Sequence, residues 1–537
     1  MAAPYDGVIL GAGHNALVLH AYLARSGLRV LSLDRAHVAG GGLATEEDPP
    51  GFRHNTHSFF HRAITAMPWY RDLELERHGA RYIEPELNVA LILEDGRALQ
   101  WWTDRNKTVE SFAEFSGDDA RALTRWTDEF DPIVEQILRV EAQSPPLEPD
   151  RRRELLGRSA AGRRLLEVSA MSPLEFVERE FKHDVVRAGL LFFNGLREVD
   201  LRLNGFGHSI PALLAGKHKA QMCIGGSARL AEALISDIRE HSGDVRTGVE
   251  IRSILTRDGR AVGVELSDGE RIEANGFVAS GLNPQQTFLD LLDADSATPD
   301  IRRRASRFQY NLLAPLCSLH LSLTEPPRYR AAERRPELNR AFMVIVGLEH
   351  FSQFTDIVRA HETGTLPPTV LWGACPTLFD PSQAPPGKHT AFMWEKVPYA
   401  LRGSAENWNA EIESQGHTMI EVWSRFAPNL ADGAVLHQFT RSPVDTERKF
   451  PNMHHGDLLV GSFDHDQVGF HRPFPGAGRY RAPVAGLYLC GGSTHPGGNI
   501  TGLCGYNAAF VIAADLGLGL WWHPVEAEAA FERLSQG

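Results

Sequence analysis

The chain has 537 residues, too many for one hydrophobic core, which predicts about three units or a two-domain enzyme with insertions. Its 43% hydrophobic and 23% charged residues are typical of a globular protein and exclude a disordered or fibrous chain. Asp and Glu outnumber Lys and Arg, 68 against 55, and the formal charge of −13 disfavours nucleic acid as a partner, because that binding depends on neutralising phosphates.

The N-terminal segment predicts a strand, a helix and a second strand. Residues 5–10 are a short apolar strand, the glycine-bearing residues 11–16 follow it, and residues 17–26 have the composition of a helix. Residues 28–33 form the second apolar strand, which ends at Asp34. This order is that of a βαβ unit, the opening unit of a dinucleotide-binding domain.

The turn after the first strand has the form G-x-G-x-x-A, with Gly11, Gly13 and Ala16. Glycines let backbone N–H groups and a helix N-terminus approach a diphosphate, and alanine is an accepted small residue at the third position. Small-residue turns also join strands to helices without a ligand, but Asp34 stands where a carboxylate accepts hydrogen bonds from ribose hydroxyls. No arginine cluster flanks Asp34, which disfavours a 2′-phosphate, although Arg35 is adjacent.

Two further glycine-rich segments favour FAD over NAD. Residues 40–45 follow the second strand directly and can contact the second half of an extended cofactor. Residues 496–501 lead into a predicted helix at 503–516, and N–H groups at a helix start stabilise the negative charge that a flavin gathers at N1 and O2 when it accepts hydride. A generic glycine-rich loop is the alternative interpretation of the second segment.

The remaining elements mix helices and strands. Residues 76–219 carry helical segments at 118–140 and 171–196, with a charged, proline-bearing linker at 144–153. The apolar residues 190–193 would line a substrate channel or belong to the core. Residues 291–440 are also mixed, and the other predicted elements are a helix at 228–241, strands near Val245 and Ile251, strands at 261–266, 271–274 and 276–280, and a C-terminal strand at 486–490.

Four segments give the chain a family resemblance. They are YDGVILGAGHNALVLHAYLARSGLRVLSLDR (5–35), GGGLATEEDPPGFRHNTHS (40–58), IGGSARLAEAL (224–234) and GRYRAPVAGLYLCGGSTHPGGNITGLCGYNAA (478–509). The chain resembles FAD-dependent oxidoreductases related to phytoene desaturase, especially the carotene-ketolase-like branch and the pyridine nucleotide-disulfide oxidoreductase-like proteins. The resemblance covers the cofactor-binding parts well and the middle thinly.

The resemblance implies an α/β fold in which a discontinuous Rossmann-type FAD-binding domain carries an inserted, mixed α+β substrate domain. The implied FAD-binding parts are 1–75, 220–290 and 445–520, the substrate-domain parts are 76–219 and 291–444, and a C-terminal helix occupies 521–537. The implied cofactor-binding residues are Gly11, Ala12, Gly13, His14, Asn15, Asp34 and Arg35 for the ADP half, Gly41, Gly42, Leu43 and Ala44 for the diphosphate and ribityl region, Ile251 for the adenine, and Gly491, Gly492, Gly498, Asn499, Ile500 and Thr501 for the flavin.

The chain departs from the family pattern at two positions. Asp34 replaces the more usual glutamate, which shortens the reach to the ribose. Tyr506 stands where many relatives carry arginine, and this puts the substrate class in doubt.

Four residues are candidates for catalysis, because removing hydride from carbon usually needs a partner that takes a proton or polarises a carbonyl. They are His57, His61, His495 and Tyr506. A plain polar lining is the alternative for the first two. His57 and His61 would need a helix to bind a metal together, and the extended residues 53–56 disfavour it, so no metal site is predicted.

The leading hypothesis is an FAD-dependent dehydrogenase or desaturase that forms a C=C bond in an apolar or cyclic substrate and passes electrons to oxygen or a quinone-like acceptor. One alternative is an oxidase that desaturates a small cyclic keto or carboxylic acid towards an aromatic product. Its candidate carboxylate anchors are Arg197, Arg202 and residues 302–304. Carotenoid ketolase-like oxygenation and a non-catalytic flavin-binding role are further alternatives.

The cysteines and the two ends of the chain bear on its location. Five cysteines without a C-x-x-C pair predict reduced thiols, neither a disulfide framework nor a zinc site. The first strand begins too early for a signal peptide, and no run of 18 apolar residues occurs, so a cytoplasmic protein is expected. Trp521 and Trp522 would make a peripheral membrane contact or simply pack a terminal helix.

Overall fold

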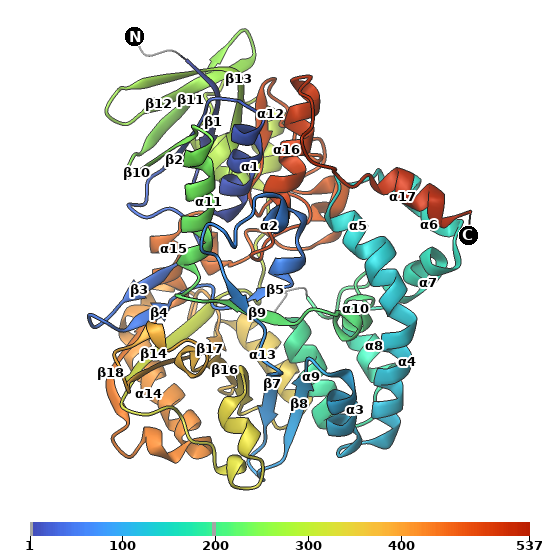
Figure 1. Ribbon diagram of the computed structural model, residues 1–537, viewed down its shortest axis with the longest axis vertical. Helices are drawn as coiled ribbons and strands as arrows, with labels where there is room; N and C mark the ends of the chain where they lie inside the picture. Colours follow the sequence, from blue (N-terminus) through green and yellow to red (C-terminus); the bar gives the residue numbers. More distant parts are fainter. Residues whose placement is uncertain (1–3, 196–199, 537) are drawn as a thin grey trace.

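The computed structural model describes residues 4–195 and 200–536 and is built around two large sheets (Figure 1). The first sheet is seven-stranded, with β1, β2, β10, β13 and β19 parallel and the ribbon of β11, β12 and β13 antiparallel. Its order is β10 (Asp244–Thr247), β2 (Val30–Asp34), β1 (Tyr5–Leu10), β13 (Arg271–Ser280), β12 (Arg260–Leu266) and β11 (Ile251–Arg257), with β19 (Leu487–Leu489) beside β13.

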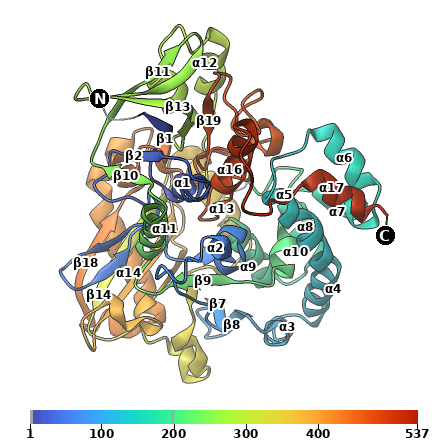
Figure 2. The ribbon, with the colours of Figure 1, turned by 45° about the horizontal axis from the view of Figure 1, so that its top comes forward.

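Three helices pack together on the first sheet, and Figure 2 shows α1 between the other two. They are α1 (His14–Arg25), α11 (Ala228–Glu240) and α16 (Leu503–Asp515), with the short α2 (Pro68–Asp72) nearby. Ten of the twelve residues of α1 are buried, as expected for a helix that has neighbours on two sides. Strands and helices from three separated parts of the chain therefore share one core.

The second sheet is also seven-stranded and mixed, because β7 and β15 pair in parallel and the other neighbours are antiparallel. One face packs on α14 (Trp408–Phe426), and the other faces α9 (Asp184–Gly195) and α13 (Ser352–Thr363). The strand order is β18 (Val435–Arg441), β14 (Leu316–Leu323), β17 (His389–Lys396), β16 (Leu371–Ala374), β15 (Met343–Val346), β7 (Leu87–Ile92) and β8 (Ala98–Trp102).

A helical lobe lies beside the second sheet (Figure 1). Besides α9, the lobe contains α3 (Arg105–Ala113), α4 (Gly117–Ile133), α5 (Arg139–Ala142), α6 (Pro149–Gly157), α7 (Ala160–Ser169), α8 (Pro173–Glu180) and α10 (Ser209–Ala215). The C-terminal helix α17 (Ala527–Leu534) packs on α6, where Arg151 forms ion pairs with Glu528 and Glu532.

Short strands connect the two large sheets. β3 (Thr45–Glu47) and β4 (Arg53–Asn55) form a hairpin, and β9 (Ala220–Cys223) lies between β5 (His61–Arg62) and β6 (Tyr82–Ile83). Two more helices, α12 (Pro299–Ser306) and α15 (Pro443–Lys449), complete the set of regular α-helices and strands in the described residues.

Three predicted elements differ in the structure. The helix expected at 118–140 changes at Val134 into a π-helix of five residues, two residues after Pro132, which lacks an N–H for the helical ladder. The helix expected at 171–196 splits into α8 and α9, because the carboxylate of Asp119 accepts from the N–H groups of residues 182 and 183 at the break. The linker expected at 144–153 is helical from Pro149, a residue suited to the first helical position.

The strand expected at 271–274 and the separate strand expected at 276–280 form the single strand β13. Its first half pairs with β12 and its second half with β1 and β19, so one strand serves both parts of the sheet.

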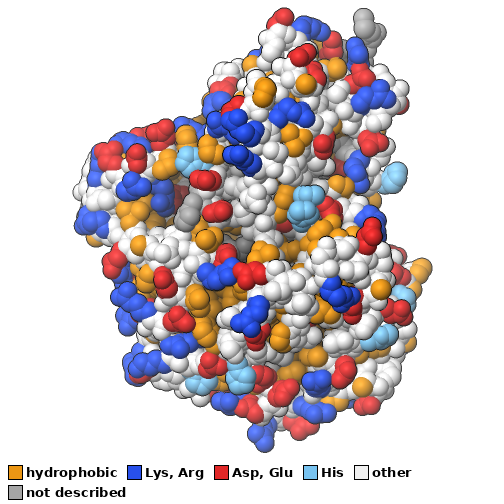
Figure 3. All heavy atoms as spheres, turned by 180° about the vertical axis from the view of Figure 1, so that it is seen from behind, with side chains coloured by type: hydrophobic (Ala, Val, Ile, Leu, Met, Phe, Trp, Pro, Cys, Tyr) orange, Lys and Arg blue, Asp and Glu red, His pale blue; other side chains and the backbone are white. Residues whose placement is uncertain are grey.

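The surface carries charges of both signs. On the face seen in Figure 3, Lys and Arg side chains are interspersed with Asp and Glu over most of the area. Exposed pairs within one helix, such as Arg153 with Asp150 at 3.0 Å, contribute little to stability. None of the described helices combines the length and the apolar character needed to cross a bilayer.

The two C-terminal tryptophans pack against α1. The ring of Trp521 stacks on Tyr22 with centroids 5.1 Å apart, and its Nε1–H donates to the carbonyl oxygen of Tyr22. Trp522 is only 3% exposed. Trp521 is 36% exposed, so packing accounts for Trp522, and the peripheral membrane contact stays a prediction.

Candidate functional site

The glycine turn lies at the carboxyl end of β1. Gly11 has φ +90°, a conformation that glycine adopts without strain, and its N–H donates to the carbonyl oxygen of Leu33 at 2.7 Å. The second glycine segment touches the first, because a Cβ atom on Gly41 would stand 3.2 Å from Cα of Gly13. A Cβ atom on Gly13 itself would meet nothing within 4 Å. Space therefore remains in front of the N-terminus of α1.

Asp34 is held over this turn. Its Oδ2 accepts from the N–H of Ala12 at 2.7 Å and its Oδ1 from the N–H of Ala36 at 2.9 Å. The carbonyl oxygen of Asp34 accepts from the N–H of Val249 at 3.0 Å, which brings the segment before Ile251 to the same edge. Arg35 is exposed beside it. Asp34, predicted to bind the ribose, and the segment before Ile251, predicted to contact the adenine, thus lie at the same edge of the sheet.

The start of α16 adjoins the start of α1. The Nε2–H of His14 donates to the carbonyl oxygen of Asn499 at 3.0 Å, and Asn499 has φ +76°. The Nε1–H of Trp69 donates to the carbonyl oxygen of Thr501 at 2.7 Å. Asn15 is 4% exposed and faces α16, where a Cβ atom on Gly505 would stand 1.8 Å from its carbonyl oxygen.

Gly491 and Gly492 follow β19, and Gly491 is the more closely confined of the two. A Cβ atom on Gly491 would stand 2.4 Å from the carbonyl oxygen of Gly281. A Cβ atom on Gly492 would stand 3.5 Å from Cα of Gly498. The predicted flavin loop is therefore folded back on itself next to the first sheet.

His57 comes together with residues predicted to hold the ribityl and flavin parts. A Cβ atom on Gly42 would stand 3.5 Å from Cδ2 of His57 and 3.8 Å from Cδ1 of Ile500. Leu43 is buried, and the carbonyl oxygen of Ala44 accepts from the N–H of Thr56.

The imidazole of His57 stacks on Phe450 with centroids 4.8 Å apart. Burial lowers the pKa of His57 to about 3, and the positive charges of Lys449 and Arg441 act in the same direction. His57 is therefore neutral at physiological pH.

His61 is placed by hydrogen bonds at both ring nitrogens. Nε2 bonds to Oγ of Ser58 at 2.8 Å and Nδ1 to the hydroxyl of Tyr82 at 2.6 Å. Burial lowers the pKa of His61 to about 3, and the nearby His14 adds to the shift. Both ring nitrogens are engaged, so in this arrangement His61 positions its neighbours rather than offering a free base.

His495 and Tyr506 make their contacts elsewhere. The Nε2–H of His495 donates to the carbonyl oxygen of Glu141 in the helical lobe at 2.8 Å, and burial lowers the pKa of His495. Tyr506 is 1% exposed and meets Tyr22 edge to face at 5.3 Å, and burial raises its pKa. Tyr506 thus lies between α1 and α16. The catalytic roles of all four candidates stay predictions.

Sequence reasoning missed a row of aromatic side chains along the second sheet. The row, which we call the aromatic row, joins Phe59 to Phe392 at 5.0 Å, Phe392 to Trp394 at 4.6 Å, Trp394 to Trp372 at 5.7 Å and Trp372 to Phe192 at 5.5 Å, measured between ring centroids. It begins two residues from His57 and ends on α9. On β17, Phe392 and Trp394 stand two positions apart, a spacing that predicts two side chains on the same face of a strand.

Two buried histidines adjoin the row, and of these His320 was also missed. His320 on β14 is 0% exposed and stacks on Phe439 with centroids 4.8 Å apart, and neither ring nitrogen has a hydrogen-bond partner among the described residues. His54 meets His320 edge to face, and its Nε2 bonds to Oγ of Ser322 at 3.3 Å. Burial keeps the pKa of both imidazoles well below the usual 6.5.

The comparisons with known proteins agree with this geometry. A model of the NAD(P)-binding Rossmann-like domain matches residues 9–73. A limonene dehydrogenase subunit of Castellaniella defragrans is 31% identical over 552 residues, covering 98% of this chain and 98% of that protein. This chain belongs to the family of FAD-dependent oxidoreductases related to phytoene desaturase.

Further relatives extend the likeness of this FAD-dependent oxidoreductase. Pyridine nucleotide-disulfide oxidoreductase domain-containing protein 2 of Mus musculus is 28% identical and covers 95% of this chain and 94% of its own. The neurosporene-forming phytoene desaturase of Rhodobacter capsulatus is 24% identical, covering 54% of this chain and 53% of its own.

Solved structures show the same fold. An oxidoreductase of Methanosarcina mazei has a TM-score of 0.61 at 15% identity, covering 95% of this chain and 99% of its own. Cyclohexylamine oxidase of Brevibacterium oxydans has a TM-score of 0.60 at 15% identity, covering 96% and 100%. The predicted α/β fold with a discontinuous FAD-binding domain is confirmed, whereas the exact domain boundaries stay predictions.

The residues of this FAD-dependent oxidoreductase fit its cofactor. Neither α1 nor α16 has a side-chain cap or an acidic residue in its first turn, so both helix N-termini can meet the negative charge of a diphosphate or a reduced flavin. The glycines of the two converging loops leave the room that Cβ atoms would fill. Among the described residues, no group of three or more His, Cys, Asp or Glu side chains is placed to hold a metal.

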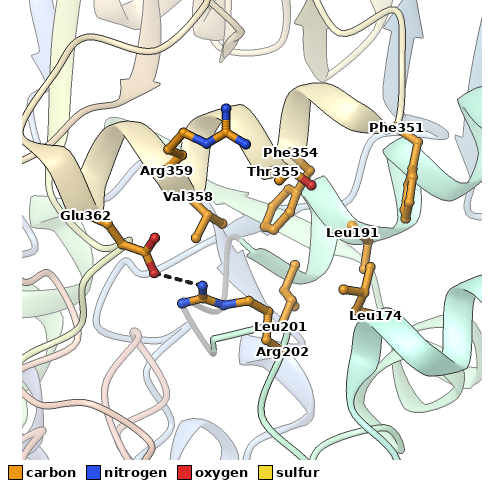
Figure 4. Close-up of a pocket in the computed structure, with 10 residues that line it drawn as sticks. All are labelled: Leu174, Leu191, Leu201, Arg202, Phe351, Phe354, Thr355, Val358, Arg359 and Glu362. Atoms are coloured by element: carbon orange, nitrogen blue, oxygen red, sulfur yellow. Dashed lines mark hydrogen bonds and ion pairs between the residues drawn. The ribbon is translucent and has the colours of Figure 1, made fainter.

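A separate pocket of about 230 Å³ lies between α8, α9 and α13 (Figure 4). Arg202 points into it and pairs with Glu362 at 2.7 Å, and it also binds Asp200. No predicted cofactor residue lines this pocket. Of the other proposed carboxylate anchors, Arg303 and Arg304 pair with Asp300 on α12, and Arg302 donates to the carbonyl oxygens of Phe288 and Leu289. Arg197 lies outside the described residues.

Proposed function

We propose that this FAD-dependent dehydrogenase introduces a C=C bond into an apolar, cyclic or isoprenoid substrate and passes the electrons to oxygen or a quinone-like acceptor. Dehydrogenation or desaturation in general follows from family membership. The finer proposal takes its substrate class from the names of relatives that act on limonene and phytoene. We also propose a cytoplasmic location, in keeping with five buried free cysteines.

The observation that carries the substrate class is the aromatic row. Its five rings are each at most 6% exposed and run from the neighbourhood of His57 to the helical lobe. Aromatic side chains contribute large apolar contact areas. The rings belong to one buried core cluster, and Nζ of Lys396 lies 5.7 Å from the centroid of Trp372, so a molecule placed along them would meet mainly apolar surface and one cation. This mainly apolar surface supports an apolar substrate.

The described arginines proposed as carboxylate anchors already have partners. Arg202 is already bound by two carboxylates, and Arg303 and Arg304 pair with Asp300 on the first-sheet side of the molecule. A substrate carboxylate would have to displace one of these partners. We therefore favour the apolar substrate over the keto or carboxylic acid of the alternative hypothesis.

The chain itself is assigned two tasks, accepting a proton and excluding water. The bound flavin supplies the hydride acceptor. Neutral His57, next to Gly42 and Ile500, would receive the proton from the carbon beside the one that loses hydride. Such a proton is acidic once hydride has left, so a base of low pKa suffices. The buried surroundings exclude water from the electron-deficient carbon.

The test is anaerobic spectroscopy of the purified holoprotein. We expect a cyclic or acyclic isoprenoid hydrocarbon to bleach the flavin band near ~450 nm, since hydride transfer reduces the flavin. The panel also contains cyclic ketones and carboxylic acids. Bleaching by an acid alone would replace the proposed substrate class, and no bleaching by any member would contradict the proposal.

Shortening one ring of the aromatic row is expected to weaken substrate binding. Phe392→Ala removes apolar contact worth about 1.5–3 kcal/mol, so the KM for the bleaching substrate should rise at least about tenfold with a smaller change in kcat. Met393→Ala is the matched control, because the neighbouring side chain on β17 packs on the opposite face of the sheet. Equal effects of the two substitutions on KM would contradict a substrate-contacting role for the row.

A further inference from the structure

Arg472 is a fully buried arginine at the base of the predicted flavin loop. Arg472 is 1% exposed, and its guanidinium carbon lies 4.5 Å from the ring centroid of Phe463. All three nitrogens donate to backbone carbonyl oxygens of two loops, at distances of 2.8–3.3 Å. The acceptors are Val460, Gly461, Ser462, Gln467, Gly492 and Thr494.

The positive charge of Arg472 has no direct counter-ion. None of the carboxylates in the described residues forms an ion pair with it. Asp457, which is 0% exposed, is linked to it through one peptide group: the N–H of Gly461 donates to Asp457 at 2.8 Å, and the carbonyl oxygen of Val460, in the same peptide group, accepts from Arg472 at 3.3 Å. Burial lowers the pKa of Arg472 to about 10, so it stays cationic at neutral pH. Burying a charge without a carboxylate is costly, and a purely structural clamp would not need it.

The geometry directs this charge at the flavin loop. Nη2 donates to the carbonyl oxygen of Gly492 at 3.0 Å and Nε to that of Thr494 at 3.2 Å. In a trans peptide the N–H group points opposite to the carbonyl, so the N–H group that follows Gly492 is turned away from the guanidinium. A charge on the carbonyl side polarises such a peptide and strengthens the positive end on its far side. Asp457 accepts from the N–H groups of Asn311 and Leu459, and Leu459 in turn contacts Gly498 of the loop.

We propose that Arg472 tunes the flavin: its buried charge, acting through the loop that contains Gly492 and Thr494, stabilises the reduced, anionic flavin and raises the reduction potential. When the substrate gives hydride to the oxidised flavin, two electrons and one proton enter the ring, the substrate later loses a proton to base, and the flavin gains one negative charge. The inference rests on the proposed placement of the flavin at 498–501. Arg472 is therefore a positioning and tuning residue rather than a catalytic one.

The test measures the midpoint potential of the holoprotein by dye-equilibrated reduction, without any organic substrate. In Arg472→Gln the equilibrium constant for two-electron reduction should fall about tenfold, which is about 30 mV for a two-electron couple. Arg472→Lys keeps the charge and should keep the potential, although it loses hydrogen bonds and lowers Tm. Asp457→Asn removes the negative end of the buried pair and should raise the potential by a smaller amount.

Arg25→Gln is the matched control. Arg25 is also largely buried, but it pairs with Asp237 at the far end of α1 from the glycine turn. It should lower Tm and leave the potential unchanged. The inference is overturned by a wild-type potential in Arg472→Gln, or, if that variant does not hold FAD, by an unchanged or lowered potential in Asp457→Asn. A wild-type chain that binds no FAD would overturn the cofactor assignment as well, and failure to find a substrate would leave the inference standing.

Discussion

Replacing Gly505 by alanine is expected to release FAD and to lower the free energy of unfolding by about 3 kcal/mol. The added Cβ atom would stand 1.8 Å from the carbonyl oxygen of Asn15, 2.8 Å from its carbonyl carbon and 3.0 Å from the backbone nitrogen of Leu19. All three are backbone atoms of α1, so no side-chain rotation relieves the contact. The two helices must separate, and with them the helix N-termini assigned to the diphosphate and the flavin.

The measurement is the ratio of flavin to protein absorbance after purification, together with Tm. Gly157→Ala is the matched control, because that helical glycine has nothing within 4 Å of an added Cβ atom. It should keep both values. A Gly505→Ala protein that retains its full FAD content and Tm would show that α1 and α16 can move apart freely, against the close contact described above.

The first βαβ unit could be predicted because its signals are local. The apolar run, the glycines of the turn and Asp34 lie in one short stretch, and the observed β1 covers the residues expected for it. Within that stretch the carboxylate of Asp34 meets the N–H of Ala12 because β1 and β2 are parallel neighbours that end at the same edge of the sheet.

The catalytic surroundings could not be predicted in the same way. His57 contacts Met453 across 396 positions of sequence, and His320 meets Phe439 only because β14 and β18 pair in one particular register. No local pattern specifies such a register. Arg472 carried no signal at all, since its acceptors are backbone carbonyls, which every sequence has.

Tyr506 illustrates a different difficulty. The family resemblance placed this position near the flavin, and the residue does lie in the first turn of α16. Successive residues of a helix point about 100° apart, however, so nearness along the chain does not decide which face a side chain occupies. The side chain here faces α1, where it packs on Tyr22.

Lowering the pH from 6.5 to 5.5 is expected to reduce the free energy of unfolding by at least about 4 kcal/mol. Five histidines that are at most 5% exposed account for this amount: His20, His54, His61, His320 and His361. Burial is the largest cause of their lowered pKa values, which are about 3 for His20 and His61 and about 4 for His54 and His361. Burial also lowers the pKa of His14 to about 4 and that of His57 to about 3, which adds to the loss in the same direction. The native state keeps them neutral, whereas the unfolded chain binds their protons near pH 6.5.

The sign follows from this difference in bound protons. Below pH 6.5 the unfolded state holds more protons, so the stabilisation is complete above that pH and is lost as the pH falls, by about 1 kcal/mol per histidine over the first unit. Glu395 acts in the opposite sense: burial raises its pKa to about 7, so acid favours its native, protonated form and offsets about one histidine. The net loss of at least about 4 kcal/mol is a large part of an ordinary folding free energy.

Urea unfolding of the FAD-saturated protein at pH 6.5 and 5.5 measures this loss. His361→Asn should reduce the pH dependence by about 1 kcal/mol, because the histidine lies on α13 away from the cofactor residues and donates only to the carbonyl oxygen of Ile357. Glu395→Gln should increase it by a similar amount, since the opposing group is then gone. Equal unfolding midpoints at the two pH values would mean that the buried imidazoles accept protons inside the native state, and the neutral His57 on which the proposed chemistry depends would then lose its physical basis.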